Sequence, residues 1–143
     1  MKIADQIPKI IIAVLLLGGG AVVVSKVTGT SSGGGIVEVT VPELSQIAAL
    51  GKEPFDTNCV QCHGPNGSGT DKGPPLVHKI YNPGHHDDGS FMRATKNGVQ
   101  GHHWKYGNMP PQPQVNAVQI ASIIKYIREL QMGNGIFYEQ HRM

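Results

Sequence analysis

Two cysteines and a histidine lie together at Cys59, Cys62 and His63, in the sequence C-V-Q-C-H. Residues three positions apart face the same way on a helical turn, so both sulfurs can reach the vinyl groups along one edge of a porphyrin. The adjacent histidine is then carried under the ring, where an imidazole nitrogen can bind iron. The pattern therefore predicts one covalently attached haem c, with Cys59 and Cys62 as its attachment points and His63 as an axial ligand.

Other uses of a cysteine pair fit this chain less well. A thioredoxin-like dithiol would follow a strand in a βαβ unit, and a zinc site would need four ligands, usually with a second cysteine pair. The sequence indicates neither setting. These are also the only two cysteines in the chain, too close together in sequence to link distant segments through a disulfide.

A second axial ligand decides whether a haem transfers electrons or binds small ligands. The candidates after the motif are Met92, Met109, Met132, His85-His86 and His102-His103. Met109 lies in the loop Y-G-N-M-P-P, which prolines stiffen, whereas Met92 and Met132 fall on predicted helices, where methionine ordinarily packs as an apolar side chain. We predict Met109 as the distal ligand.

The elements that must position these residues are predicted to be short helices and loops, which makes the domain all-α. Pro42 is expected to open a helix through Leu50, which Gly51 and Pro54 interrupt before a second short helix leads to Cys62. Residues 63–82 and 101–114 are predicted to be loops.

Two later helices carry clearer signals. Asp87 or Asp88 can cap a short helix that Asn97-Gly98 ends. Residues 117–131 have apolar side chains at three-four spacing, a possible capping box from Asn116 and Gln119, and Gly133 near the end. This last helix is expected to pack on the core.

The composition suits a small domain built around a cofactor. The 143 residues include 19 glycines and 10 prolines but only 6% aromatic residues, which is loop-rich for a chain that must bury a core. An enclosed haem would supply apolar surface. The net charge is only +2 and no block of like charges occurs, so nucleic-acid binding is not indicated.

The N-terminus is predicted to direct the chain to a membrane. An uncharged apolar run spans residues 10–24, with Lys2 and Lys9 before it and Lys26 after it. Residues 1–27 are interpreted as a single transmembrane anchor, with a cleaved signal peptide as the alternative. Residues 28–40 form a Gly/Ser/Thr-rich linker, and residues 41–143 the haem domain.

The markers of the haem domain occur in a familiar order, and over residues 51–130 the chain resembles the class I cytochrome c family. Gly51 and Phe55 correspond to the family's helix-crossing glycine and aromatic residue, and Ile123 and Tyr126 to positions of its last helix. Gly73-Pro74-Pro75-Leu76 is similar to the family's G-P-x-L loop. There the resemblance implies that the Pro74 carbonyl accepts a hydrogen bond from His63.

The chain departs from the family in two respects. Pro54 is expected to break the family's continuous first helix, and histidines are unusually frequent, at His78, His85, His86, His102 and His103. The histidines could be solvated loop residues near the haem edge, a second metal site such as copper, a distal ligand in place of Met109, or a pH-responsive surface. The sequence does not separate these roles.

The resemblance implies a small bacterial membrane-anchored cytochrome. We expect it to pass single electrons and not to be an enzyme, because no paired carboxylates, nucleophile and base, or phosphate-binding loop accompany the haem motif. Its haem domain would face the periplasm from the cytoplasmic membrane, in agreement with the lysines before the apolar run. Its partners would be membrane redox complexes, such as a quinol-oxidising donor and a terminal oxidase or photosynthetic reaction centre as acceptor. The alternatives are a haem-bearing subunit fixed in such a complex and a haem/copper redox enzyme that uses the histidine-rich loops.

Overall fold

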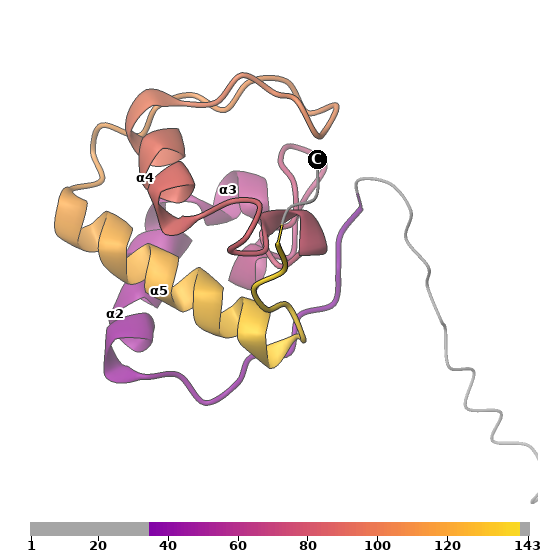
Figure 1. Ribbon diagram of the computed structural model, residues 1–143. Helices are drawn as coiled ribbons and strands as arrows, with labels where there is room; N and C mark the ends of the chain where they lie inside the picture. Colours follow the sequence, from indigo (N-terminus) through magenta and orange to yellow (C-terminus); the bar gives the residue numbers. More distant parts are fainter. Residues whose placement is uncertain (1–34, 141–143) are drawn as a thin grey trace, which may run out of the picture. The chain divides into compact units, whose positions relative to one another are not determined.

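A computed structural model describes residues 35–140, which form helices joined by long loops (Figure 1). The elements are α2 (Gln46–Asn58), α3 (Val60–His63), the 3₁₀ turns η2 (Pro65–Gly67) and η3 (Lys79–Tyr81), α4 (Asp88–Asn97) and α5 (Ala117–Gly133). Within residues 35–140 the β pairing is limited to one bridge, between Val99 and Met109. The predicted all-α class is confirmed for this part of the chain.

The predicted membrane anchor, residues 1–27, lies outside the described residues, as does the beginning of the predicted linker. Among residues 35–140 no helix has both the length and the apolar character needed to cross a bilayer.

The crossing of α2 and α5 is the central packing contact of the domain (Figure 1). A Cβ atom built on Gly51 of α2 would lie 2.0 Å from the backbone oxygen of Ser122 in α5, so only glycine allows this approach. Beside the crossing, the rings of Phe55 and Tyr126 meet with centroids 5.5 Å apart, and both side chains are fully buried. The two helices and their aromatic pair therefore form the core on which the loops rest.

The last helix forms as predicted because its signals are local. Asn116 accepts hydrogen bonds from the backbone nitrogens of Val118 and Gln119, and the Gln119 side chain accepts one from the Asn116 nitrogen. This capping box satisfies donors that the first turn leaves without helical partners. Asp87 caps α4 in the same way, through a 2.6 Å bond from the backbone nitrogen of Ser90.

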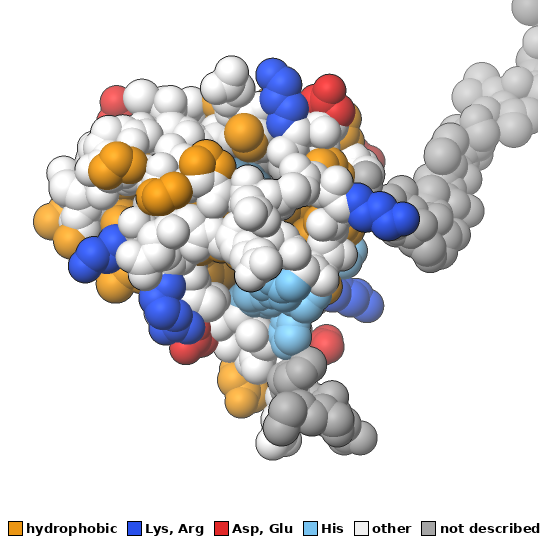
Figure 2. All heavy atoms as spheres, turned by 90° about the horizontal axis from the view of Figure 1, so that it is seen from above, with side chains coloured by type: hydrophobic (Ala, Val, Ile, Leu, Met, Phe, Trp, Pro, Cys, Tyr) orange, Lys and Arg blue, Asp and Glu red, His pale blue; other side chains and the backbone are white. Residues whose placement is uncertain are grey.

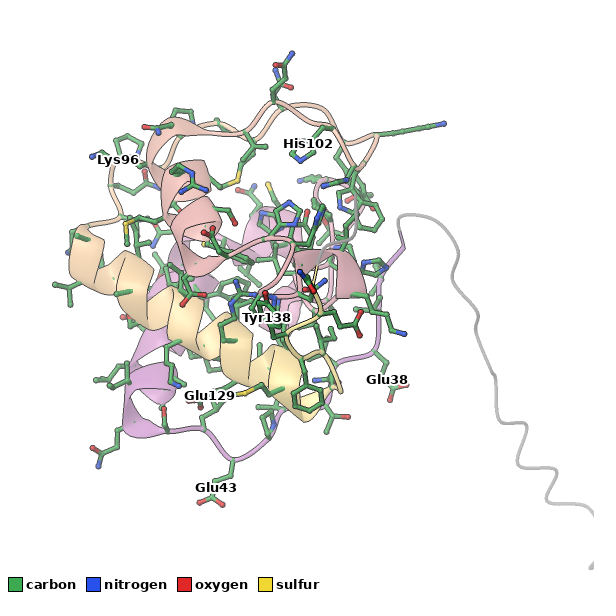
Figure 3. All side chains as sticks on the ribbon, viewed as in Figure 1. Glu38, Glu43, Lys96, His102, Glu129 and Tyr138 are labelled. Atoms are coloured by element: carbon green, nitrogen blue, oxygen red, sulfur yellow. The ribbon has the colours of Figure 1, made fainter. Side chains whose placement is uncertain are left out.

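The prediction for the start of the first helix was wrong. α2 begins at Gln46 and not at Pro42, because the Ser45 hydroxyl caps it by accepting a bond from the Ala48 nitrogen. Ser45 is itself held by Glu129, which is labelled on α5 in Figure 3. The Glu129 carboxylate accepts bonds from the Ser45 nitrogen at 2.8 Å and from its hydroxyl at 2.7 Å. A contact distant in sequence thus decides where this helix starts.

The predicted break at Gly51 and Pro54 was also wrong, since α2 runs through both residues and both are buried. Proline in a helix removes the bond to the carbonyl four residues earlier, which here belongs to Leu50. Pro54 is nevertheless among the buried residues of α2, together with Gly51 and Phe55. Packing of α2 against α5 outweighs the lost bond.

Candidate functional site

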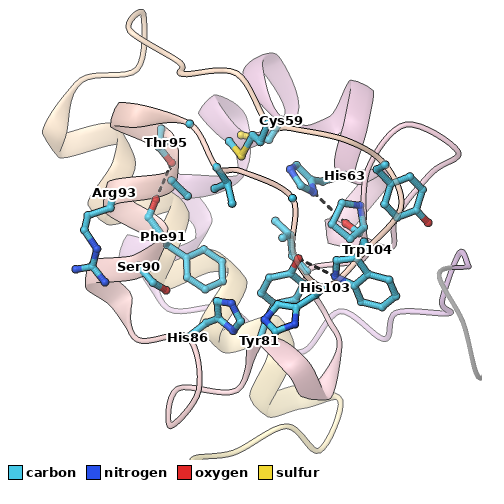
Figure 4. Close-up of a pocket in the computed structure, with 18 of the residues that line it drawn as sticks. Cys59, His63, Tyr81, His86, Ser90, Phe91, Arg93, Thr95, His103 and Trp104 are labelled. Atoms are coloured by element: carbon cyan, nitrogen blue, oxygen red, sulfur yellow. Dashed lines mark hydrogen bonds between the residues drawn. The ribbon is translucent and has the colours of Figure 1, made fainter.

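A cavity of about 280 Å³ lies between α2, α3, α4 and the loop that follows α4 (Figure 4). Its apolar wall includes Phe55 of α2, Phe91 of α4, Val99 of the loop after α4, Ile123 of α5, and Leu76 of the loop between η2 and η3. Cys59, His63, Pro74 and Met109 also line it. Four of the five predicted site residues therefore meet at one cavity.

The C-x-x-C-H motif forms a single helical turn at the edge of this cavity. The Cys62 and His63 nitrogens both donate to the Cys59 carbonyl, at 3.1 and 2.9 Å. Cys59 is partly buried and lines the cavity, whereas Cys62, the fifth predicted residue, is exposed and does not line it. Burial, and then the neighbouring Cys62, raise the pKa of the Cys59 thiol to about 11, which keeps it protonated at neutral pH.

His63 projects from the end of α3 with its ring orientation fixed. Its Nδ1 lies 2.9 Å from the Pro74 carbonyl oxygen, as the G-P-x-L resemblance implied (Figure 4). A carbonyl can only accept, so Nδ1 carries the proton and Nε2 keeps a lone pair. Burial lowers the pKa of His63, although the bond to Pro74 acts in the opposite direction. The residue is thus a neutral imidazole, the form that binds metals.

Met109 is held at the cavity by its backbone. The Val99 nitrogen donates to the Met109 carbonyl at 2.9 Å, and the Met109 nitrogen donates to the Val99 carbonyl at 3.0 Å. Gly98 precedes this bridge with a φ of 78°, and a Cβ atom there would lie 2.6 Å from the Met109 carbonyl oxygen. The other two candidate methionines, Met92 and Met132, are 45% and 46% exposed, and neither lines the cavity.

Two aromatic residues that sequence reasoning did not assign to the site also line the cavity. Trp104 donates from its indole nitrogen to the Tyr81 hydroxyl at 3.0 Å (Figure 4). Burial raises the pKa of Tyr81 to about 12, more than the hydrogen bond from Trp104 lowers it. The scarcity of aromatic residues in the chain was the one signal that could have drawn attention to this pair.

Three of the five histidines whose role was left open, His86, His102 and His103, line the same cavity. His85 lies against His103, with 3.2 Å between their Nε2 atoms. His78 contacts Trp104 edge-on, with ring centroids 5.1 Å apart.

The residues present fit a covalently attached haem c. Two thiols and an imidazole are carried on one helical turn, a thioether sulfur lies on the same cavity, and the remaining wall is largely apolar and aromatic. An imidazole and a thioether are an established donor pair for haem iron. The C-x-x-C-H motif, the apolar walls and the two donor atoms therefore all fit haem c.

Comparison with known proteins points the same way. The family model of cytochrome c matches residues 48–131 of the chain. No curated protein and no solved structure matches it. The matched segment begins in α2 and ends in α5, so it contains every residue of the cavity described above.

Proposed function

This chain belongs to the cytochrome c family, whose haem c serves electron transfer, and from that membership we propose that it is a single-haem electron carrier and not an enzyme. In this proposal Cys59 and Cys62 hold the haem covalently, and His63 and Met109 are its axial ligands. When bound, haem c supplies a one-electron couple between ferric and ferrous iron.

One observation carries the proposal: His63 and Met109, a nitrogen and a sulfur donor, line the same cavity. With both donors on the iron, no position is left for a substrate. A methionine ligand also raises the reduction potential of a haem, which suits a carrier that accepts electrons from other redox proteins.

The other residues of the site serve to keep these two donors in place. The Pro74 carbonyl orients His63 and increases its basicity. The bridge to Val99 fixes the backbone at Met109. The buried rings of Phe55 and Tyr126 make the floor beneath the cavity rigid, and apolar walls limit access of water to it.

We further propose that the protein is tethered to the cytoplasmic membrane by residues 1–27, with its haem domain in the periplasm. The apolar run at 10–24 and the lysines around it support this placement. The short linker would keep the domain near the bilayer, so membrane redox complexes are the expected partners, either as transient contacts or with this chain as a fixed subunit.

The axial ligands can be tested by spectroscopy of the haem-loaded protein. Wild-type ferric protein should show the sulfur-to-iron absorption band of methionine-ligated haem, and its ferrous form should bind carbon monoxide slowly. Met109→Ala should lose the band and bind carbon monoxide rapidly. Met92→Ala, which removes a half-exposed methionine from α4, is the matched control and should behave as wild type. Rapid binding of carbon monoxide by the wild type would overturn the carrier in favour of an enzyme.

The placement and partners can be tested by purification from membranes in mild detergent. The proposal expects the intact chain in the membrane fraction together with redox proteins. Recovery of the intact chain, free of partners, after a simple salt wash would contradict both the anchor and the fixed-subunit alternative.

A further inference from the structure

The histidines of two separate loops meet in one cluster beside the cavity. The ligand nitrogens of His85, His86 and His103 all lie within 4.8 Å of one another. Figure 2 shows histidine side chains gathered in a patch on one face of the surface. His85 and His86 follow η3, whereas His103 lies in the loop after α4, so the fold and not the local sequence brings them together.

His86 is prepared for metal binding by its hydrogen bond. Its Nδ1 lies 2.7 Å from the carbonyl oxygen of Ile80, so Nδ1–H donates and Nε2 retains its lone pair. Histidines that bind metals usually donate their second ring nitrogen to a carbonyl or carboxylate in this way, which fixes the tautomer and the direction of the lone pair.

The loop that carries His86 is also anchored to the core. Arg128 of α5 is buried and donates to the carbonyl oxygens of His86 and, at 2.7 Å, of Tyr81. The same guanidinium donates to the Asp88 carboxylate at 2.7 Å, two residues after His86. These contacts join the loop that carries His86 to α5, whose side chains form much of the core, so less ordering is needed when a metal binds.

The spacing of the nitrogens matches a small coordination sphere. Two nitrogens bound to one tetrahedral ion at about 2.0–2.1 Å lie roughly 3.3–3.4 Å apart. The Nε2 atoms of His85 and His103 are 3.2 Å apart, and the ligand nitrogen of His86 lies within 4.8 Å of both ligand nitrogens. The group contains no carboxylate, which disfavours calcium and magnesium.

We propose that His85, His86 and His103 form a second metal site, distinct from the haem, that binds one late first-row transition-metal ion, with copper(II) bound more tightly than zinc(II). Imidazole ligands favour these ions, and the order follows the usual rise of affinity toward copper. His86 and His103 also line the haem cavity, so the site lies at its rim. The proposal does not depend on the electron-carrier function.

The test uses full-length, haem-loaded ferric protein without an affinity tag, stripped of metal with a chelator. Copper(II) alone is added and followed by calorimetry and by electron paramagnetic resonance. We expect one ion per chain, with nitrogen hyperfine structure from imidazole ligands. His103→Gln and His85→Gln should each weaken binding by more than about 100-fold, the upper end of what loss of a supporting partner costs. Zinc(II) should bind at the same stoichiometry but more weakly.

His78→Gln is the matched control, because His78 lies in the same part of the chain but outside the cluster. It should bind copper(II) as wild type does. Equal affinity in the wild type and in the triple variant of His85, His86 and His103, or equal loss in His78→Gln, would overturn the site. The haem absorption bands of the same samples report folding and haem attachment separately, so failure of the metal site is distinguishable from failure of the haem site.

Discussion

Replacement of Gly51 by alanine tests whether the crossing of α2 and α5 holds the domain together. The added Cβ would lie 2.0 Å from the Ser122 oxygen and 2.4 Å from its carbonyl carbon, whereas ordinary contacts begin at 3.4 Å. Both atoms belong to the backbone of a helix, so no side-chain rotation relieves the overlap. The two helices must separate by more than an ångström along the contact that carries Phe55 and Tyr126.

Overpacking of a well-packed core costs typically about 1–3 kcal/mol, and occasionally more. Because the clash is between backbones, we expect Gly51→Ala to lower the free energy of unfolding by about 3 kcal/mol. For a domain of roughly 100 residues this corresponds to a fall in melting temperature of about 12–24 °C. Guanidinium unfolding of the haem-loaded protein, followed by circular dichroism, measures the change.

Two controls make the result specific. Leu50→Ala changes the adjacent residue on the exposed side and should stay within about 0.5 kcal/mol of wild type. Ser122→Gly should not rescue Gly51→Ala, because the clashing oxygen remains when the side chain is removed. A loss below 1 kcal/mol in Gly51→Ala, or rescue by Ser122→Gly, would refute the close backbone contact.

Three further predictions follow from other contacts. Gly98→Ala should displace Met109 and weaken the sulfur-to-iron absorption band, because the added Cβ would meet the Met109 carbonyl oxygen. Gly107→Ala, at a residue with a similar φ of 85° but open space around it, should keep the band, and equal bands in the two variants would contradict the role of Gly98 in placing Met109. Arg128→Met should lower the free energy of unfolding by about 3 kcal/mol in denaturant, because it leaves the carbonyls of Tyr81 and His86 without this donor. Arg93→Met removes an exposed ion pair and should change the free energy of unfolding by less than about 0.5 kcal/mol. Burial alone would raise the pKa of Glu129, but hydrogen bonds from Ser45 and the neighbouring Lys125 lower it, so the stability from this carboxylate is present above its ordinary pKa of 4.5 and is lost as the pH falls through the lower folded value. Glu129→Gln should therefore reduce the dependence of the unfolding free energy on pH in this acidic range, and an unchanged dependence would contradict this role of Glu129.

Features with local causes could be predicted from the sequence. The caps at Asp87 and Asn116 lie within a few residues of the backbone groups they bind, so α4 and α5 could be placed closely. The C-x-x-C-H motif is likewise contained in one helical turn. Met109 could be singled out because the other two methionines fall on helices, and in the structure it is the methionine that lines the cavity.

Features that depend on contacts between residues distant in sequence could not be predicted from the sequence. Glu129 holds Ser45, the cap of α2, and α2 continues through Pro54 because the helix packs on α5; neither contact shows in a local pattern. The bridge of Met109 to Val99 and the meeting of His103 with His85 join residues whose closeness depends on the path of the loops. The frequency of histidine was visible in the sequence, but its clustering was not.

The bridge between Val99 and Met109 also bears on how such a domain can evolve. It closes the loop that carries His102 and His103, while Met109 is held at the base of that loop and not by its tip. Lengthening a closed loop costs little, about 0.6 kcal/mol for each doubling. Substitutions and insertions near the tip can therefore add or remove surface ligands while the methionine stays in place. The fold thus separates the bridge that holds Met109 from the loop that carries the surface histidines.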